Sequence, residues 1–449
     1  MRKISASVLF VMALLCLPSV GFSQHTPDAL LGYWQGGFIK GNSFQRLEMH
    51  IFEEKGKLLS LQVLEEWHPS FGEFLRPVKV DSLGNISLGS GHGAATLTLD
   101  EQYLELVGQV EGRSPTIYIH LKKVPAPPAL DYSVNAVQIP GDGVSLSGHL
   151  HLPRYNPTRT ALILVGGRSC YAGETKYDLM AKVLRDYGIT VLAYQKRGTG
   201  KSTGDCQTAT IEDLAADVRA CHAFLKQQEG GYDKIGVMGS SAGGWVMAKA
   251  QEKVDFDFMI SIVGPGTSVF DQQMQSMDYG MKRYNLPKES REGLLKYTQM
   301  MFEAPATQAS FDSFQALLKE AKEYGWSELL DNTDIPPSVA GIDSLWVRRH
   351  SFDPEAVLSQ YTHPFLAIYG QRDWIVPYEE NIAQLEACFS RKRRSLLTTH
   401  VAYDGEHGIE TRARYVDLGR NQSYWHFFRI SPQLTIETVN FLRRHRFIE

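Results

Sequence analysis

The chain has 449 residues, of which 43% are hydrophobic and 21% are charged, and its formal net charge is −4. This length predicts two domains, and the composition excludes a disordered or collagen-like chain. The short cluster at 391–394 is the most basic stretch and is interpreted as a solvated loop, so we expect no nucleic-acid partner.

Residues 1–23 predict a signal peptide. Arg2 and Lys3 give a positive start, an apolar run follows at 8–17, and the small residue Ser23 precedes the expected cleavage point. The apolar run is shorter than a membrane-spanning helix requires. We therefore expect an exported protein, periplasmic or secreted, whose mature chain begins near Gln24 and has no stable membrane span.

Residues 24–124 predict a small antiparallel β domain. Apolar residues alternate with polar or small ones, as at Leu47, Met49 and Ile51, and turn-forming clusters separate the runs. About eight short strands at this spacing indicate a barrel or a sandwich. The proline-containing stretch 125–140 is interpreted as a linker, because proline interrupts central strands and helices.

Residues 141–449 predict an α/β domain with a parallel sheet. Continuous apolar runs, which are typical of buried parallel strands, lie at 161–165, 190–194, 235–238 and 258–263. Segments with helical periodicity separate these runs, and that alternation indicates helices on both faces of the sheet.

The alternation stops over 268–358, where helical patterns predict an inserted block that we call the lid. It resumes at 365–369 and 396–402. The apolar side chains of the lid either line a pocket or pack the core of the lid itself, and both alternatives are open for Met300, Met301, Phe302, Phe311, Phe314, Trp326 and Trp346.

The strongest chemical signal is Gly239-x-Ser241-x-Gly243 between a predicted strand and a predicted helix. In this context the sharp turn exposes the serine hydroxyl at the end of the strand, and small residues two positions before and after it prevent collisions. The alternative is an ordinary Gly/Ser turn. We interpret Ser241 as a nucleophile.

A nucleophilic serine needs a base and a carboxylate that orients the base. Asp373 follows the strand at 365–369, and His407 lies in a glycine-flanked loop after the strand at 396–402, so we assign them as acid and base. Asp404 and Glu379 are the competing acids. The other candidate histidines are interpreted as structural: His149, His151, His222, His400 and His426.

An acyl-transfer site also needs two backbone N–H groups for the oxyanion. We expect one from Ala242, which follows the serine, and one from Arg168 in the loop at 166–170, here called the oxyanion loop. The Arg168 side chain could meet a substrate carboxylate or form a structural salt bridge. The sequence has no metal-ligand spacing, so we expect neither a metal nor another cofactor.

From about residue 140 the chain resembles the α/β-hydrolases, and more narrowly the bacterial exported EstD-type esterases and related serine-aminopeptidase-like hydrolases. The resemblance is carried by the Ser241 turn and by residues 194–204, 213–218, 369–377 and 406–408. It implies an α/β-hydrolase fold. The sequence at 31–36 resembles the first strand of lipocalin-like modules, and exported members of the family also carry a small β domain ahead of the hydrolase.

The expected function is hydrolysis of carboxylic esters through a Ser-His-Asp triad and an acyl-enzyme. The alternatives are an exopeptidase or amidase of the same fold, an acyl-thioesterase, and a binding protein without catalysis. The expected partner is a small-molecule ester or a short peptide. An exopeptidase needs acidic side chains for a free amino terminus, and the lid offers Glu289, Glu292, Glu303, Glu320 and Glu323.

Cys170 and Cys206 follow strands that are neighbours in α/β-hydrolases, so both belong to loops at the same sheet edge. Export permits a disulfide between them, and the alternative is two unrelated thiols. Cys221 and Cys388 lie in helical patterns and are interpreted as inert core thiols.

Overall fold

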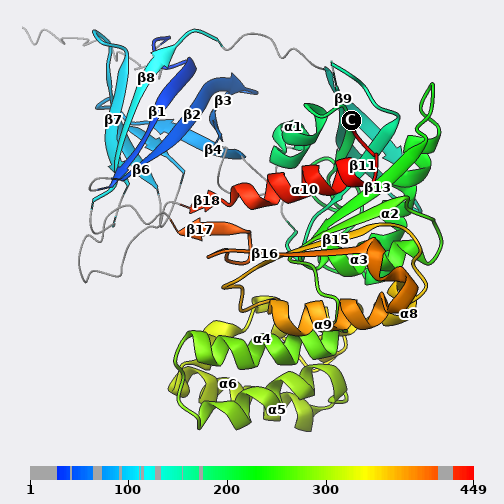
Figure 1. The fold of residues 1–449 in the computed structure, drawn as a ribbon. Helices are drawn as coiled ribbons and strands as arrows, with labels where there is room; N and C mark the ends of the chain where they lie inside the picture. Colours follow the sequence, from blue (N-terminus) through cyan, green and yellow to red (C-terminus); the bar gives the residue numbers. More distant parts are fainter. Residues whose placement is uncertain are drawn as a thin grey trace, which may run out of the picture.

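The computed structural model of the chain describes residues 28–40, 43–63, 73–89, 94–110, 112, 116–126, 133–153, 155–170, 175–412 and 428–449. The predicted signal peptide lies outside these residues. Two units are visible in Figure 1, a closed β-barrel and an eight-stranded sheet with helices around it. The antiparallel β domain and the α/β domain expected from the sequence are both confirmed.

The barrel is antiparallel throughout, and it closes because β1 pairs with β2 on one side and with β8 on the other. Its strands are β1 (Gly32–Lys40), β2 (Ser43–Glu54), β3 (Lys57–Val63), β4 (Glu73–Val80), β5 (Ile86–Leu88), β6 (Ala95–Asp100), β7 (Glu105–Val110) and β8 (Tyr118–Val124). Alternate residues such as Trp34, Leu47 and Leu97 point into a filled apolar core. Trp34 Nε1–H donates to the Leu30 carbonyl at 3.0 Å, which satisfies its one polar group.

The large sheet has the strand order β16-β15-β14-β13-β11-β12-β10-β9. Its strands are β9 (Ser133–Pro140), β10 (Ser145–Leu152), β11 (Thr160–Val165), β12 (Thr190–Tyr194), β13 (Lys234–Ser240), β14 (Phe258–Ile262), β15 (Phe365–Gly370) and β16 (Leu397–Ala402). β10 pairs antiparallel with β9 and β12, and the pairs from β12 to β16 are parallel. The carboxyl ends of the parallel strands therefore meet at one sheet edge.

The predicted linker 125–140 is wrong at its C-terminal end. Residues 133–140 form β9, which pairs with β10 along its whole length, and Ile139 is fully buried in the core of the α/β domain. Proline is tolerated at the end of an edge strand, so Pro140 ends β9 without disturbing the ladder. The α/β domain therefore begins at residue 133 or earlier, and 127–132 lie outside the described residues.

Helices cover both faces of the sheet, as the alternating pattern predicts. α1 (Leu179–Arg185) and α10 (Pro432–Arg444) pack on one face, and their buried side chains share one apolar core. α2 (Ile211–Lys226), α3 (Gly243–Gln251) and α9 (Tyr378–Cys388) contribute to the core on the other face. No helix in the described part of the chain combines the length and apolar character that a membrane crossing requires.

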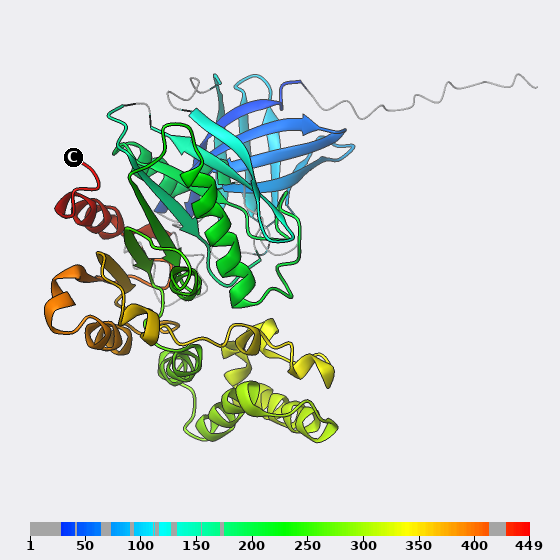
Figure 2. The same cartoon turned by 90° about the vertical axis from the view of Figure 1, so that its right-hand side faces the viewer.

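The lid is a helical insertion between β14 and β15. Its elements are α4 (Val269–Arg283), α5 (Ser290–Glu303), α6 (Gln308–Tyr324), the short turns η2 (Trp326–Leu329), η3 (Asn332–Asp334) and η4 (Ala340–Ile342), and the short helices α7 (Trp346–Arg349) and α8 (Glu355–Leu358). Side chains of Ser268 and Thr307 cap the starts of α4 and α6. The two views in Figures 1 and 2 show the lid helices below the sheet and apart from the barrel.

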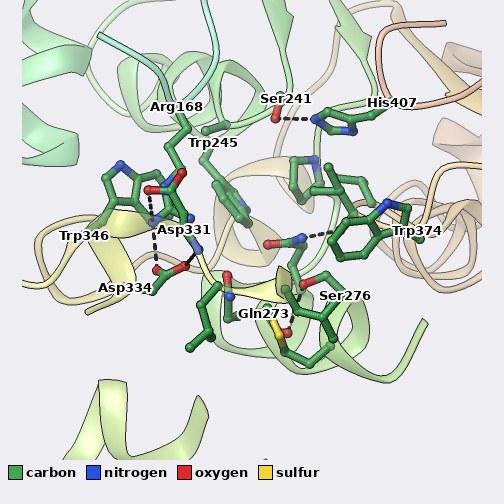
Figure 3. Close-up of a pocket in the computed structure, with 18 of the residues that line it drawn as sticks. Arg168, Ser241, Trp245, Gln273, Ser276, Asp331, Asp334, Trp346, Trp374 and His407 are labelled. Atoms are coloured by element: carbon green, nitrogen blue, oxygen red, sulfur yellow. Dashed lines mark hydrogen bonds and ion pairs between the residues drawn. The ribbon is translucent and has the colours of Figure 1, made fainter. Parts of the chain in front are cut away.

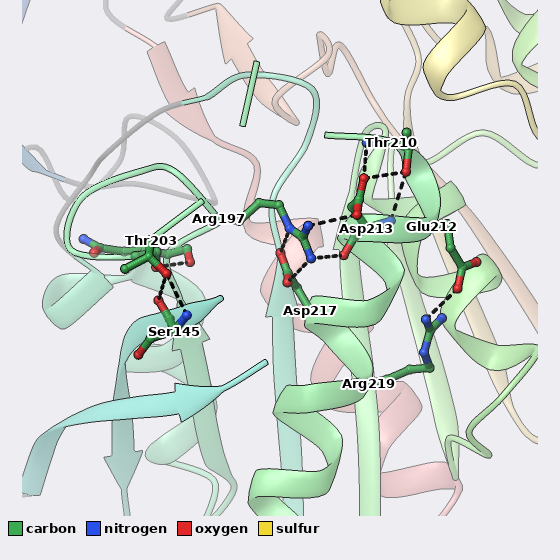
Figure 4. Close-up of polar contacts among 10 residues, drawn as sticks. Ser145, Arg197, Thr203, Thr210, Glu212, Asp213, Asp217 and Arg219 are labelled. Carbon is green, nitrogen blue, oxygen red and sulfur yellow. Dashed lines mark hydrogen bonds and ion pairs between the residues drawn. The ribbon is translucent and has the colours of Figure 1, made fainter. Parts of the chain in front are cut away.

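A buried arginine ties the turn after β12 to helix α2 (Figure 4). The Arg197 guanidinium donates to both carboxylate oxygens of Asp217, at 2.8 and 3.0 Å, and to Asp213 at 2.9 Å. The Asp217 side chain is fully buried. Because removal of one partner from a buried ion pair strands the other charge, such a loss costs about 3–5 kcal/mol. Arg197 thus anchors a turn that runs beside the sheet edge.

Candidate active site

Ser241 occupies a sharp turn between β13 and α3, and its φ of 52° lies in the left-handed region. A Cβ at position 239 would collide with the Gly243 carbonyl, and a Cβ at position 243 would lie 2.6 Å from the Val165 carbonyl. Only glycine therefore fits at the positions two residues before and two residues after this serine. The Ser241 N–H donates to the Ile262 carbonyl at 2.9 Å, which holds the strained turn against β14.

Ser241, His407 and Asp373 form one hydrogen-bonded chain at the carboxyl edge of the sheet. Ser241 Oγ lies 2.9 Å from His407 Nε2, and His407 Nδ1 lies 2.8 Å from Asp373 Oδ2. The other oxygen of Asp373 accepts the N–H groups of Ile375 and Val376 at 2.8 and 3.0 Å. The carboxylate is thus fixed and buried, and it keeps the proton of the imidazole on Nδ1, which leaves Nε2 free to accept from the serine hydroxyl.

The pKa of His407 is raised above its ordinary value. Burial alone would lower this pKa, but the charge of Asp373 and its hydrogen bond outweigh burial, and Glu410 adds a smaller attraction. The imidazole is therefore a stronger base than a free histidine.

The competing acids are elsewhere. Asp404 accepts from the Arg372 guanidinium at 3.0 Å, and Glu379 lies in the first turn of α9. In the described residues, Asp373 is the carboxylate that hydrogen-bonds to His407. The remaining candidate histidines are distributed over the scaffold: His149 and His151 in β10, His222 in α2 and His400 in β16, whereas His426 lies outside the described residues.

Both residues expected to supply the oxyanion donors, Ala242 and Arg168, line the same pocket as Ser241. A Cβ at position 167 would lie 3.1 Å from Ser241 Cβ, so glycine lets the oxyanion loop approach the serine closely. In the described part of the chain, neither Ala242 N–H nor Arg168 N–H donates to another protein group. Two unused donors near a serine hydroxyl are what an oxyanion site requires.

The oxyanion loop is held by the turn after β12. Cys170 and Cys206 form a disulfide with a Cα–Cα distance of 5.8 Å, so the pairing that the sequence left open is confirmed. Lys196 Nζ donates to the carbonyls of Gly167 and, at 3.1 Å, Ser169. Burial lowers the pKa of Lys196 to about 8. Both ends of the loop are therefore attached to the sheet scaffold.

The pocket next to Ser241 has a volume of about 340 Å³ and lies between the sheet edge and the lid (Figure 3). Its apolar wall includes Trp245, Trp346 and Trp374. The lid contributes its polar wall, formed by Gln272, Gln273, Ser276, Glu328, Asp331 and Asp334. This combination of an apolar body with a few polar groups is typical of small-molecule sites.

Of the apolar lid residues considered from the sequence, Trp346 lines this pocket. Met301, Phe314 and Trp326 are buried in the core of the lid, and the other three pack against that core. The glutamates considered for an amino terminus also do not line it. Glu328 and Asp331 do, and sequence reasoning missed them because they belong to short turns without helical periodicity.

Comparison with known proteins points to a hydrolase. Residues 156–284 match the family model described as serine aminopeptidase, S33. The comparison with curated proteins finds no significant match.

Among solved structures, the chain is similar to the esterase Pf2001 of Pyrococcus furiosus, with 18% identity, a TM-score of 0.44, and coverage of 72% of this chain and 94% of that one. It is also similar to Est1E of Butyrivibrio proteoclasticus bound to ferulic acid, with 17% identity, a TM-score of 0.42, and coverage of 70% and 100%. The strand order and the turn at Ser241 are those of the α/β-hydrolase fold, and residues 156–284 are similar to the serine aminopeptidase S33 family.

Proposed function

We propose that the protein is a serine hydrolase that cleaves carboxylic esters through an acyl-enzyme. The observation that carries this proposal is the hydrogen-bonded chain from Ser241 through His407 to Asp373, which opens onto a pocket of about 340 Å³. A serine hydroxyl becomes a useful nucleophile when an oriented imidazole accepts its proton, and this chain supplies that arrangement.

In the proposed reaction, His407 Nε2 takes the Ser241 proton as Oγ attacks the ester carbonyl. The N–H groups of Ala242 and Arg168 stabilise the oxyanion, each by on the order of 3 kcal/mol of barrier. His407 then protonates the departing alcohol, and the C–O bond to it breaks. Water, deprotonated by the same nitrogen, then attacks the acyl-enzyme. The bond to Ser241 Oγ breaks, His407 returns the proton to that oxygen and the acid is released, while Asp373 remains ionised throughout.

The pocket supports an ester with a compact, largely apolar acyl or alcohol group. Three tryptophans line its wall, and the Arg168 guanidinium is already paired with Asp334, so that side chain is not available as a free cation for a substrate carboxylate. Volume and apolar lining together favour a small ester over a long peptide.

A second candidate is cleavage of a peptide or amide with a free amino group. Glu328 and Asp331 are carboxylates on the pocket wall, and Glu328 is exposed without a protein partner in the described residues. A carboxylate in this position attracts an ammonium group. The ester proposal and the amide proposal share the same nucleophile, and they differ in what the lid wall recognises.

The test begins with labelling by a fluorophosphonate, with Ser241→Ala as the control. Labelling of the wild type alone supports a serine hydrolase, and absence of labelling supports a binding protein instead. A panel of p-nitrophenyl esters is then compared with aminoacyl-naphthylamides. Turnover of the esters alone supports the proposed substrate class, and faster turnover of the naphthylamides replaces it by the second candidate.

We also propose that the protein is exported. The charged and apolar pattern at 1–23 supports this, and so does the Cys170–Cys206 disulfide, because structural disulfides persist in oxidising compartments. Cell fractionation, with N-terminal sequencing of the purified protein, tests the proposal. A chain recovered from the cytoplasm with residues 1–23 intact would contradict it.

A further inference from the structure

We infer that the Arg168 side chain couples the lid to the oxyanion loop, so that the seated lid sets the position of the Arg168 N–H donor. Asp334, with no contact to the reacting atoms, is then a positioning residue. This inference rests on the proposed function and goes beyond it, because it assigns a role in the reaction to an ion pair between two segments far apart in the chain.

The lid end of this contact is formed by three residues around the guanidinium. Arg168 donates to Asp334 Oδ1 at 2.7 Å and to the Thr333 hydroxyl, and its guanidinium lies 4.4 Å from the ring centroid of Trp346. Figure 3 shows the arginine reaching down from the loop towards Asp331, Asp334 and Trp346. The arginine is therefore held by charge, by hydrogen bonds and by an aromatic face at once.

Asp334 is a fixed part of the lid. Its side chain is only 1% exposed, and its second carboxylate oxygen accepts the Asp331 N–H at 3.1 Å. Its carbonyl accepts the Tyr297 hydroxyl at 3.0 Å, which connects η3 to helix α5. A displacement of the lid body would therefore move Asp334 with it.

The loop end of the contact lies directly against the nucleophile. Gly167 packs close to Ser241, and Lys196 and the Cys170–Cys206 disulfide hold the residues on either side of Arg168. Arg168 is thus the residue of this loop that reaches both sides: it directly follows Gly167, which packs against Ser241, and its side chain ends in the lid. The position of its N–H depends on where the guanidinium is fixed.

The chemical consequence follows from how sharply oxyanion stabilisation depends on geometry. A donor must be in place before charge develops on the substrate, and a misplacement of about 1 Å costs on the order of 100-fold in rate. A lid that is lifted from its seat would release the guanidinium and loosen the donor. Substrates that allow the lid to seat would then react fastest.

The experiment is a double-mutant cycle with Arg168→Met, Asp334→Asn and the double variant. Arg168→Met retains the main-chain N–H, so it tests the side chain alone, and Asp334→Asn removes the charge at nearly constant volume. The matched control is Arg291→Met, because Arg291 pairs with Asp278 inside the lid and its side chain is 59% exposed. Each variant is measured for kcat and KM on a p-nitrophenyl ester, for the fluorophosphonate labelling rate, and for its thermal unfolding midpoint.

We expect each single variant to lower kcat and the labelling rate by roughly 10- to 100-fold, with KM changed less than about threefold. The double variant should be no slower than the slower single variant, because both remove the same coupling. Arg291→Met should retain wild-type kinetics. The unfolding midpoints separate a loss of chemistry from a loss of fold, and Asp334→Asn remains informative if Arg168→Met does not fold.

Two results would overturn the inference while leaving the proposed function intact. One is wild-type kcat in Asp334→Asn, and the other is losses that multiply in the double variant. Absence of Ser241-dependent labelling in the wild-type protein would contradict the proposed function itself, and this outcome is distinct from the two results above.

Discussion

The base and the roof of the pocket are built by different kinds of contact. The base consists of loops at the sheet edge, where backbone hydrogen bonds, glycine-dependent packing and a disulfide hold Ser241 and the oxyanion loop. The roof is the lid, which meets these loops largely through side chains, as in Arg168–Asp334 and Arg283–Glu406. The base is therefore expected to be rigid, apart from the Arg168 N–H whose position we infer to depend on the lid, and the roof to be able to move without unfolding the sheet.

This contrast assigns the proposed chemistry to the base and access to the pocket to the roof. Arg283 belongs to α4, and its partner Glu406 directly precedes His407, so the roof contacts the histidine loop as well as the oxyanion loop. The Gln272 amide also donates to the Ile375 carbonyl beside the acid. The lid thus touches each loop that contributes a residue to the proposed reaction, and single side-chain changes can weaken these contacts one at a time.

The largest effect is expected at the base. Ser241→Ala, His407→Ala and Asp373→Asn should each lower kcat by on the order of 10⁴-fold or more while the unfolding midpoint changes little, because the three groups act as a unit. Steady-state kinetics on an ester substrate measure this loss, and double variants should be little worse than single ones. Asp404→Asn is the comparison, and a dead Asp404→Asn beside an active Asp373→Asn would reverse the assignment of the acid.

The second prediction concerns the disulfide. Cys170 and Cys206 are separated by 36 residues, so loss of the bridge in Cys206→Ser should lower the free energy of unfolding by roughly 3–4 kcal/mol in the chain-entropy model. Chemical denaturation measures this change. Titration of the unreduced, denatured mature chain should detect only the thiols of Cys221 and Cys388. Four reactive thiols would show that the bridge does not form.

The third prediction follows from the raised pKa of His407. Only the neutral imidazole accepts the serine proton, so kcat/KM should fall as the pH drops through this pKa, about tenfold per pH unit on the acid side. Because the shift is upward, the half-maximal point should lie above the ordinary histidine value of about 6.5. In Asp373→Asn the remaining activity should fall off at a lower pH. An acid limb that stays in place after this substitution would assign it to another group.

The smallest effect is expected at the roof. Arg283→Met removes the contact between α4 and Glu406, whose side chains are 26% and 14% exposed, and should lower kcat/KM by only about threefold, as partly exposed ion pairs contribute on the order of 1 kcal/mol. Kinetics at two salt concentrations measure it, with Lys282→Met, at a mostly exposed pair inside α4, as the control. A loss as large as that of Ser241→Ala would mean that the position of the histidine loop itself depends on the lid.

Much of the architecture could be predicted because it depends on local patterns of apolar and glycine residues in the sequence. Buried strands such as β11 and β13 are continuous apolar runs, and the turn at Ser241 carries glycine where its neighbours leave no space for a Cβ. The edge strand β9 was missed because its half-exposed sequence lies next to prolines and has no such run. Short strands at an edge depend more on their partner than on their own composition.

The sequence by itself determined the order of elements, the candidate nucleophile and the loops from which its partners come, since these depend on spacing along the chain. The tertiary structure decided which lid residues face the pocket. It joined Arg168 to Asp334 across 166 residues, brought Glu328 and Asp331 to the wall, and turned Met301 and Phe314 into the core of the lid. The physical reason is that helices of similar apolar character can pack inwards or towards the site, and only the positions of all their neighbours select between the two.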